Sequence, residues 1–275
     1  MYSAKAALDV CGIQLRKNLI SGRTFLIALL MGMYLYVLLQ PVRDMAAEVG
    51  YSVTPLAFVF LSCDSIAQMI LMAGVVALFA NAPFDDETYS YMIVRSGKGA
   101  WTAGNCMYIL TMSFIYTAYI WLISTLVMFP YIDWQIKWGK IWGTLAATDA
   151  PERYGLQFSV QNGLKRSYEP SVALAHSLLA EWSCAAFLGE CAYLFNKLTN
   201  KPVGTWLGAG FVFWDITIYN LLDMDWIKYS PLSLAMISNM INSRFGITLG
   251  YSLSFMAFGV AIMGALSYAH EKVMK

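Results

Sequence analysis

The stretch from Thr102 to Phe129 reads TAGNCMYILTMSFIYTAYIWLISTLVMF and contains no charged residue. A helix needs about 20 apolar residues to cross the hydrocarbon core of a bilayer, so this stretch is long enough to span it. Only 13% of the residues in the chain are charged and 59% are hydrophobic, whereas roughly 25% of the residues in soluble domains are charged. The composition therefore indicates a membrane protein.

Five further apolar stretches are candidates for membrane spans. The first of them is the shortest and the last but one contains an acid, so five or seven spans are alternatives to six. A secretory signal peptide competes for the first stretch, but that stretch exceeds the 7–15 apolar residues of a signal core. We expect an all-α membrane protein with a six-helix domain over residues 24–275, whose other spans are Thr24–Gln40, Leu56–Ala80, Ser171–Leu194, Val203–Leu221 and Gly246–Tyr268.

Basic residues beside the first span predict the orientation, because short loops rich in Lys and Arg stay in the cytoplasm. Lys5, Arg16, Lys17 and Arg23 precede that span, and only Arg43 follows it closely. Both termini are therefore expected in the cytoplasm. This places Arg95, Lys98, Lys197, Lys201, Lys272 and Lys275 inside, and Lys137, Lys140, Arg153, Lys165, Arg166, Lys228 and Arg244 outside, where long loops have little influence.

Residues 1–23 have the pattern of an amphipathic helix. Lys5, Asp9, Arg16 and Lys17 lie off its apolar stripe, which suits a helix lying flat in the inner membrane interface and ending near Ser21 and Gly22. An ordinary cytosolic helical tail is the alternative. The apolar stripe consists of Leu8, Cys11, Gly12, Leu15 and Leu19, at positions i, i+3, i+4, i+7 and i+11.

The longest polar segment, residues 130–170, is expected outside. Trp134, Trp138 and Trp142 are spaced by four, which predicts an interfacial helix because indole rings favour the headgroup region. A short hairpin is expected around residues 161–163. A cap over an exit pathway and a plain connector are equally compatible with this loop.

Residues 223–245, which lie before the last span, are too short and too polar to cross the bilayer. Their half-buried pattern after Pro231 predicts one short re-entrant helix in the outer leaflet. Backbone of this kind is tolerated at membrane depth only where protein or water covers it.

Four acids fall within predicted spans: Asp64, Glu181, Glu190 and Asp215. Each costs about 2.5–3.5 kcal/mol at a helix centre, so such acids usually face protein or water. They are candidates for a polar translocation path, and hydrogen bonding between spans is the alternative for each. Glu181 and Glu190 are nine residues apart and point to opposite faces of a helix, so they cannot form one catalytic pair.

No catalytic or metal-binding motif is present. The chain has no P-loop, zinc-protease, nucleophile-elbow or dinucleotide-binding pattern. The five cysteines are expected to be small apolar residues in or beside spans, and His176 and His270 are too far apart for a zinc site. We therefore expect no enzyme activity, metal or cofactor in this chain, and the net charge of +1 gives no reason to expect nucleic-acid binding.

A polar segment between the second and third predicted spans, residues 81–101, reads NAPFDDETYSYMIVRSGKGAW. Its acidic start at Asp85 to Glu87, its Thr88, the apolar residues 92–94 and the basic turn at 95–99 are similar to the coupling helix of type 2 ATP-binding cassette exporters. The layout of nearly the whole chain also resembles the permease subunit of that family. Ser96 and Gly97 stand where many relatives have proline.

In that family the coupling helix docks into a nucleotide-binding subunit, and the permease works as a dimer. The resemblance implies that ATP and Mg²⁺ bind to partner ATPase subunits, and that a second permease copy or a related permease completes the assembly. A solvated loop with a chance charge pattern is the alternative for this segment. The residues expected to couple to the ATPase are Phe84, Asp86, Glu87, Thr88, Tyr91, Met92 and Arg95.

These observations favour a permease subunit of an ATP-driven exporter for an amphipathic peptide or drug-like substrate. The sixteen methionines and many aromatic residues suit an adaptable apolar lining, although they are also ordinary span residues. An ion- or proton-coupled secondary transporter that uses Glu181, Glu190 or Asp215 is the alternative function, and an intramembrane enzyme is a third. The lack of disulfide candidates and of glycosylation sequons suits a bacterial cytoplasmic (inner) membrane.

Overall fold

The computed structural model describes residues 4–84, 89–241 and 245–273, with side chains to Glu271. Within these ranges the chain is almost entirely helical, and its only β-contact is an isolated parallel bridge between Val53 and Ile132. The predicted all-α fold is confirmed for this part of the chain.

Four of the described helices are long and apolar enough to cross a membrane. The predicted second span is interrupted, and its main helix α4 (Ser65–Leu78) has 14 residues. Helix α11 (Val203–Leu221) contains Asp215 and Asn220 and is not among the four. The four long apolar helices are α2 (Gly22–Val49), α6 (Lys98–Leu126), α10 (Pro170–Thr199) and α14 (Leu249–Val273).

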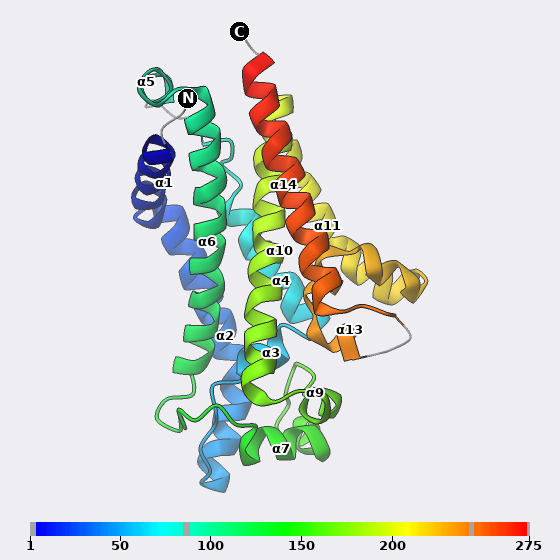
Figure 1. Cartoon of the computed structure of the whole chain (residues 1–275). Helices are drawn as coiled ribbons and strands as arrows, with labels where there is room; N and C mark the ends of the chain where they lie inside the picture. The colour runs from blue at the N-terminus through cyan, green and yellow to red at the C-terminus, as the bar shows by residue number, and fades with distance from the viewer. Residues whose placement is uncertain (1–3, 85–88, 242–244, 274–275) are drawn as a thin grey trace.

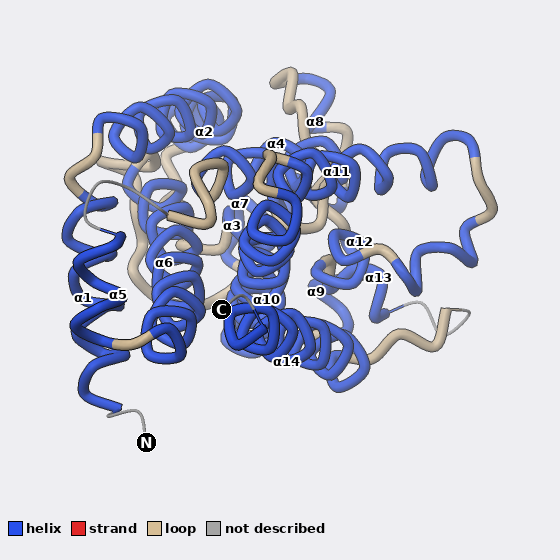
Figure 2. Tube along the Cα trace, turned by 90° about the horizontal axis from the view of Figure 1, so that it is seen from above, coloured by secondary structure: helices blue, strands red, loops and turns tan. Residues whose placement is uncertain are grey.

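Shorter helices lie at both ends of the bundle. Both chain ends and α5 lie at one end, whereas α7 and α9 lie at the opposite end (Figure 1). Seen from above, α1 lies crosswise to the long helices, at the edge of the bundle beside α6 (Figure 2). These elements are α1 (Ala4–Leu19), α3 (Ala57–Leu61), α5 (Tyr89–Ser96), α7 (Gly139–Ala147), α8 (Ala150–Arg153) and α9 (Asn162–Ser167).

The predicted continuous span over Leu56–Ala80 is broken between α3 and α4. Asp64 has an extended backbone at the break, and its Oδ1 accepts hydrogen bonds from the backbone N–H groups of Ile66 (3.2 Å) and Ala67 (3.0 Å). Its Oδ2 accepts from the N–H of Ser159 (3.2 Å), which anchors the polar loop. Asp64 is thus the N-cap of α4, because its carboxylate satisfies backbone donors that the helix itself leaves unpaired.

The segment before α14 does not form the single short helix that was predicted. Three short elements replace it, namely the 3₁₀ helix η1 (Met224–Tyr229), α12 (Pro231–Ala235) and α13 (Ile237–Ile241). Every residue of α12 is buried, and α12 contacts α10, α11 and α14. The backbone of α12 is therefore covered by protein on its neighbouring helices.

Aromatic side chains tie the long helices together through backbone carbonyl groups. The Tyr116 hydroxyl on α6 donates to Leu71 O (2.7 Å) on α4, and the Tyr119 hydroxyl donates to Ala28 O (2.6 Å) on α2. The Trp182 indole on α10 donates to a carbonyl of α6 (2.9 Å). Each aromatic residue thus fills space with its ring and satisfies its polar group within the bundle.

The loop over residues 130–170 differs from both predictions made for it. Helix α7 begins only at Gly139, which has φ +64°. Trp142 therefore lies in this helix, whereas Trp134 and Trp138 come before it, and the three do not line one helical face. Trp142 is fully buried, packs with its ring tilted against that of Phe60 (5.0 Å between ring centroids) and donates to Thr54 O (3.1 Å). The predicted hairpin is instead the start of α9. The Gln161 amide donates to Cys63 O (3.4 Å), so this loop packs onto the break between α3 and α4.

The cap on α4 predicts a specific loss of stability. Replacing Asp64→Ala should lower the free energy of unfolding by about 1–2 kcal/mol, because two N–H groups at the start of α4 lose their acceptor. The measurement is thermal or chemical unfolding of the protein purified in detergent. Asp64→Asn is the matched control, since it keeps a capping oxygen, and equal losses for both variants would contradict the capping role.

Candidate functional site

The chain that leaves α4 is fixed against the bundle before it reaches α5. Phe84 is only 3% exposed, with its ring edge-on to Tyr108 (5.0 Å) and stacked on Tyr193 (5.9 Å). Its backbone has φ +67°, a left-handed conformation that few residues other than glycine adopt. The Phe84 ring therefore belongs to the core, and its predicted role in coupling stays a prediction.

The acidic start of the predicted coupling helix lies outside the described residues. Asp85, Asp86, Glu87 and Thr88 all fall there, and the described helix begins at Tyr89. The prediction for these four positions stays a prediction.

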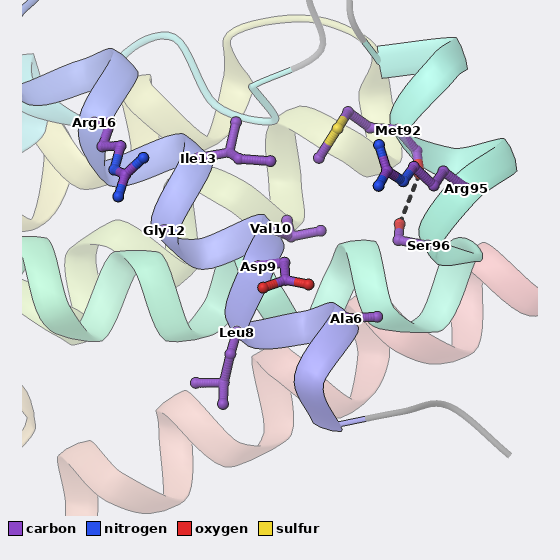
Figure 3. Close-up of a pocket in the computed structure, with 10 residues that line it drawn as sticks. All are labelled: Ala6, Leu8, Asp9, Val10, Gly12, Ile13, Arg16, Met92, Arg95 and Ser96. Atoms are coloured by element: carbon purple, nitrogen blue, oxygen red, sulfur yellow. Dashed lines mark hydrogen bonds between the residues drawn. The ribbon is translucent and has the colours of Figure 1, made fainter.

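Helix α5 presents an uncovered face. Tyr91 is 65% exposed and Val94 is 86% exposed, and Arg95 is exposed beside them with its guanidinium 3.5 Å from the Tyr91 hydroxyl. Met92 lies on the side of α5 that faces α1 (Figure 3). Of the predicted coupling residues, Tyr91 and Arg95 are therefore available to a partner, and Val94 joins them.

Helix α5 is attached to α6 through a sharp turn and a ring contact. Gly97 has φ +82°, which allows the chain to reverse between α5 and α6 without the strain of a side chain. The Tyr89 ring packs edge-on against the buried ring of Trp101 on α6 (5.4 Å). A force applied to α5 is therefore delivered directly to the first turn of α6.

Helix α1 packs closely across the same end of α6. A Cβ on Gly104 would lie 2.6 Å from Val10 Cβ and 2.7 Å from Ala7 O, so only glycine permits this approach. The face of α1 on α6 is made of Ala7, Val10, Cys11, Gln14 and Asn18. Of the predicted apolar stripe only Cys11 is buried, and Leu8 (56%) and Leu19 (44%) are exposed.

Glu181 lies in the centre of the bundle. It is 2% exposed, and its Oε1 and both polar atoms of the Gln68 side chain on α4 have no hydrogen-bond partner within the described part of the chain. Ser177, one turn earlier on α10, likewise has an unpartnered buried hydroxyl. These side chains form a buried polar region between α4 and α10.

Glu190 belongs to a second buried polar group, nearer the end at which α5 lies. Its Oε2 is 3.5 Å from Cys106 Sγ on α6. On the same side of α10, Lys197 forms an ion pair with Glu271 of α14, with both side chains at most 10% exposed, and donates to the hydroxyl groups of Thr102 (3.2 Å) and Tyr193 (3.4 Å). The Glu190 carboxylate therefore contacts α6.

Asp215 of α11 has a clear structural role. Its Oδ1 accepts hydrogen bonds from the hydroxyl groups of Ser230 (2.9 Å) and Ser233 at the start of α12. The Asn239 amide continues this network to Ser233 O and to the Tyr219 hydroxyl, both at 2.9 Å. Asp215 therefore holds the start of α12 against α11.

The four predicted path acids have different partners. Asp64 and Asp215 each organise a helix start, whereas Glu181 and Glu190 occupy separate polar regions of α10. The sequence interpretation missed the Lys197–Glu271 pair, although Glu190, Tyr193 and Lys197 recur on one helical face. Over the described residues, no group of three His, Cys, Asp or Glu side chains is arranged to hold a metal ion.

Comparisons with protein-family models, curated proteins and solved structures found no match to this chain. The arrangement at the site is therefore the basis for its interpretation.

Truncating Phe84 should identify it as a core residue. We expect Phe84→Ala to lower the free energy of unfolding by about 3–5 kcal/mol, because it opens a cavity between two buried tyrosine rings. Tyr91→Ala, on the exposed face of α5, should change it by less than about 0.5 kcal/mol. Unfolding of both variants in detergent tests this, and equal stabilities would contradict the assignment of Phe84 to the core.

The buried ion pair should be sensitive to loss of one partner. Replacing Glu271→Gln should destabilise the protein by about 3–5 kcal/mol, since it leaves the Lys197 ammonium buried without its counter-charge. Adding Lys197→Met should restore part of that loss. The matched control is Asp133→Asn, which breaks a solvent-accessible pair with Lys137 (2.8 Å) and should leave the stability nearly unchanged. Equal effects of the two single variants would contradict the buried pair.

Proposed function

We propose that this chain is the permease subunit of an ATP-driven exporter, and that separate ATP-binding cassette ATPase subunits bind ATP and Mg²⁺ and supply the energy. The observation that carries the proposal is the exposed face of α5. Tyr91, Val94 and Arg95 form an apolar and basic knob at the end of the bundle where both chain ends lie. Aromatic and arginine side chains are common anchors of protein interfaces.

The mechanical connection behind the knob supports this role. Tyr89 and Trp101 join α5 to α6, and α6 is linked to α4, α2 and α10 by the hydrogen bonds of Tyr116, Tyr119 and Trp182. An isolated exposed loop would lack such a connection. A partner that moves α5 would therefore shift α6 and the helices bonded to it.

In the proposed topology the chain crosses the membrane six times. The four long apolar helices supply four crossings, and α3 with α4 and α11 supply the second and fifth. An even number of crossings agrees with the position of both chain ends at one end of the bundle (Figure 1). The cytoplasmic side is the side of α5, because Lys5, Arg16, Lys17 and Arg23 precede the first crossing.

The assembly that we propose contains two permease chains in a bacterial cytoplasmic membrane. Its substrate is an amphipathic peptide or drug-like molecule, which suits the apolar surface of the bundle. Buried oxygen atoms without partners occur on Glu181, Glu190 and Asp215. The two glutamates are the better candidates for a polar path, because Asp64 and Asp215 each accept hydrogen bonds at the start of a helix.

Disrupting the knob should release the ATPase. The double variant Tyr91→Ala, Arg95→Glu should lose at least about tenfold in co-purification with the ATPase subunit and in nucleotide-dependent transport of fluorescent peptides and drugs, because it removes an aromatic anchor and reverses a charge at the interface. The ATPase to use is one encoded beside this chain. Co-purification and transport are both measured in membranes.

A matched pair at the far end of α2 provides the control. The Arg43 guanidinium lies over the Tyr36 ring (4.9 Å) and donates to its hydroxyl (3.2 Å), as a Tyr–Arg pair remote from α5. Tyr36→Ala with Arg43→Glu should leave the complex intact. Unchanged complex and transport in the α5 variant would overturn the docking role, and transport by the isolated chain without nucleotide would favour a secondary carrier.

A further inference from the structure

A groove of ≈ 430 Å³ lies between α1 and α5. Figure 3 shows Ile13 of α1 and Met92 of α5 pointing toward each other across it, with Arg16 toward one end and Arg95 toward the other. Val10 and Leu8 add to its apolar wall. The groove therefore combines an apolar middle with a guanidinium from each of two helices.

The charges of the groove are unbalanced. Arg16 and Arg95 contribute two positive charges and Asp9 one negative charge. Within the described part of the chain, neither guanidinium forms an ion pair, and the Arg95 guanidinium contacts the neutral Tyr91 hydroxyl (3.5 Å). An anion is the ligand that these two side chains can accept.

The groove lies beside an apolar strip suited to lipid. Asp9, Ile13 and Arg16 occupy positions i, i+4 and i+7 on one face of α1, and Leu8, Gly12, Leu15 and Leu19 occupy the neighbouring face. Leu8 and Leu19 are exposed, and α1 lies crosswise to the long helices. The helix therefore places an exposed apolar face directly beside a basic groove, which is the arrangement found at a membrane interface.

From this arrangement we propose that the groove binds the headgroup of an anionic phospholipid. The phosphate lies against Arg16 or Arg95, where a guanidinium can donate two parallel hydrogen bonds. The acyl chains follow the exposed strip of α1 into the membrane. A soluble phosphate would leave the apolar wall and the strip uncovered, so the lipid accounts for both features. The site shares Arg95 with the proposed docking face, but lipid binding is measured without an ATPase, so the two proposals can fail separately.

Asp9 provides a control of opposite sign. Its carboxylate repels the lipid phosphate, so Asp9→Asn should strengthen binding while Arg16→Gln and Arg95→Gln weaken it. Damage to the fold would weaken binding in all three variants. The three side chains project from the surface of α1 and α5 and make no buried contact.

The experiment uses the purified chain in detergent with dioleoylphosphatidylglycerol as the probe, and native mass spectrometry to measure bound lipid. Arg16→Gln with Arg95→Gln should weaken binding at the tightest site by about 30-fold, because each basic group near a lipid surface contributes about fivefold to the affinity. Asp9→Asn should strengthen it, and added salt should weaken it. Arg166→Gln, an exposed arginine on α9, should have no effect.

Further arms identify the ligand. Dioleoylphosphatidylcholine should bind at least about fivefold more weakly than the anionic lipid, since its headgroup has no net charge. Inorganic phosphate at the same concentration should not displace the anionic lipid. The proposal is overturned if the double arginine variant binds the anionic lipid as tightly as the unmodified chain, if phosphatidylcholine binds equally well, or if phosphate alone competes for the site.

Discussion

The fold depends on one constraint, which is that polar groups removed from water must find partners within the protein. At the break between α3 and α4, Asp64 supplies the acceptor that the first N–H groups of α4 need. Before α14, the Asp215 carboxylate is likewise the acceptor for two serine hydroxyl groups at the start of α12. Both acids lie where a helix begins within the body of the protein, so each allows the backbone to depart from a simple crossing helix.

The same constraint explains how α1, α5 and α6 come to form one unit. Gly104 lets the backbone of α1 approach α6 until only a hydrogen atom fits between them, and Asn18 at the end of α1 accepts a hydrogen bond from Asn81 (3.4 Å), which precedes α5. The turn at Gly97 then returns the chain into α6. The helix at the proposed docking surface is consequently braced on one side by a helix that lies crosswise to the bundle.

Much of this architecture could be predicted from the sequence, because apolar runs, basic flanking residues and an amphipathic period are local signals. The break at Asp64 could not, since an acid that caps a helix and an acid that lines a path look the same within an apolar run. The burial of Phe84 could not be predicted either, because its neighbours in sequence are charged, whereas its packing depends on Tyr108 and Tyr193, which are distant along the chain. The spacing of Trp134 and Trp142 likewise predicted one helix through both residues, whereas α7 begins only at Gly139.

The polar contacts between α6, α10 and α14 are concentrated near the end at which α5 lies. Lys197 joins Glu271 across two helices, and Glu190 faces Cys106 one to two turns deeper. Buried ion pairs add little net stability compared with apolar side chains of similar size, because desolvation offsets their attraction. Their directional contacts do, however, specify one alignment of these helices. In the proposed mechanism, a partner that moves α5 acts on the end of α6, α10 and α14 where these contacts lie. A change in the alignment of the three helices would therefore have to break the Lys197–Glu271 pair and the Glu190–Cys106 contact.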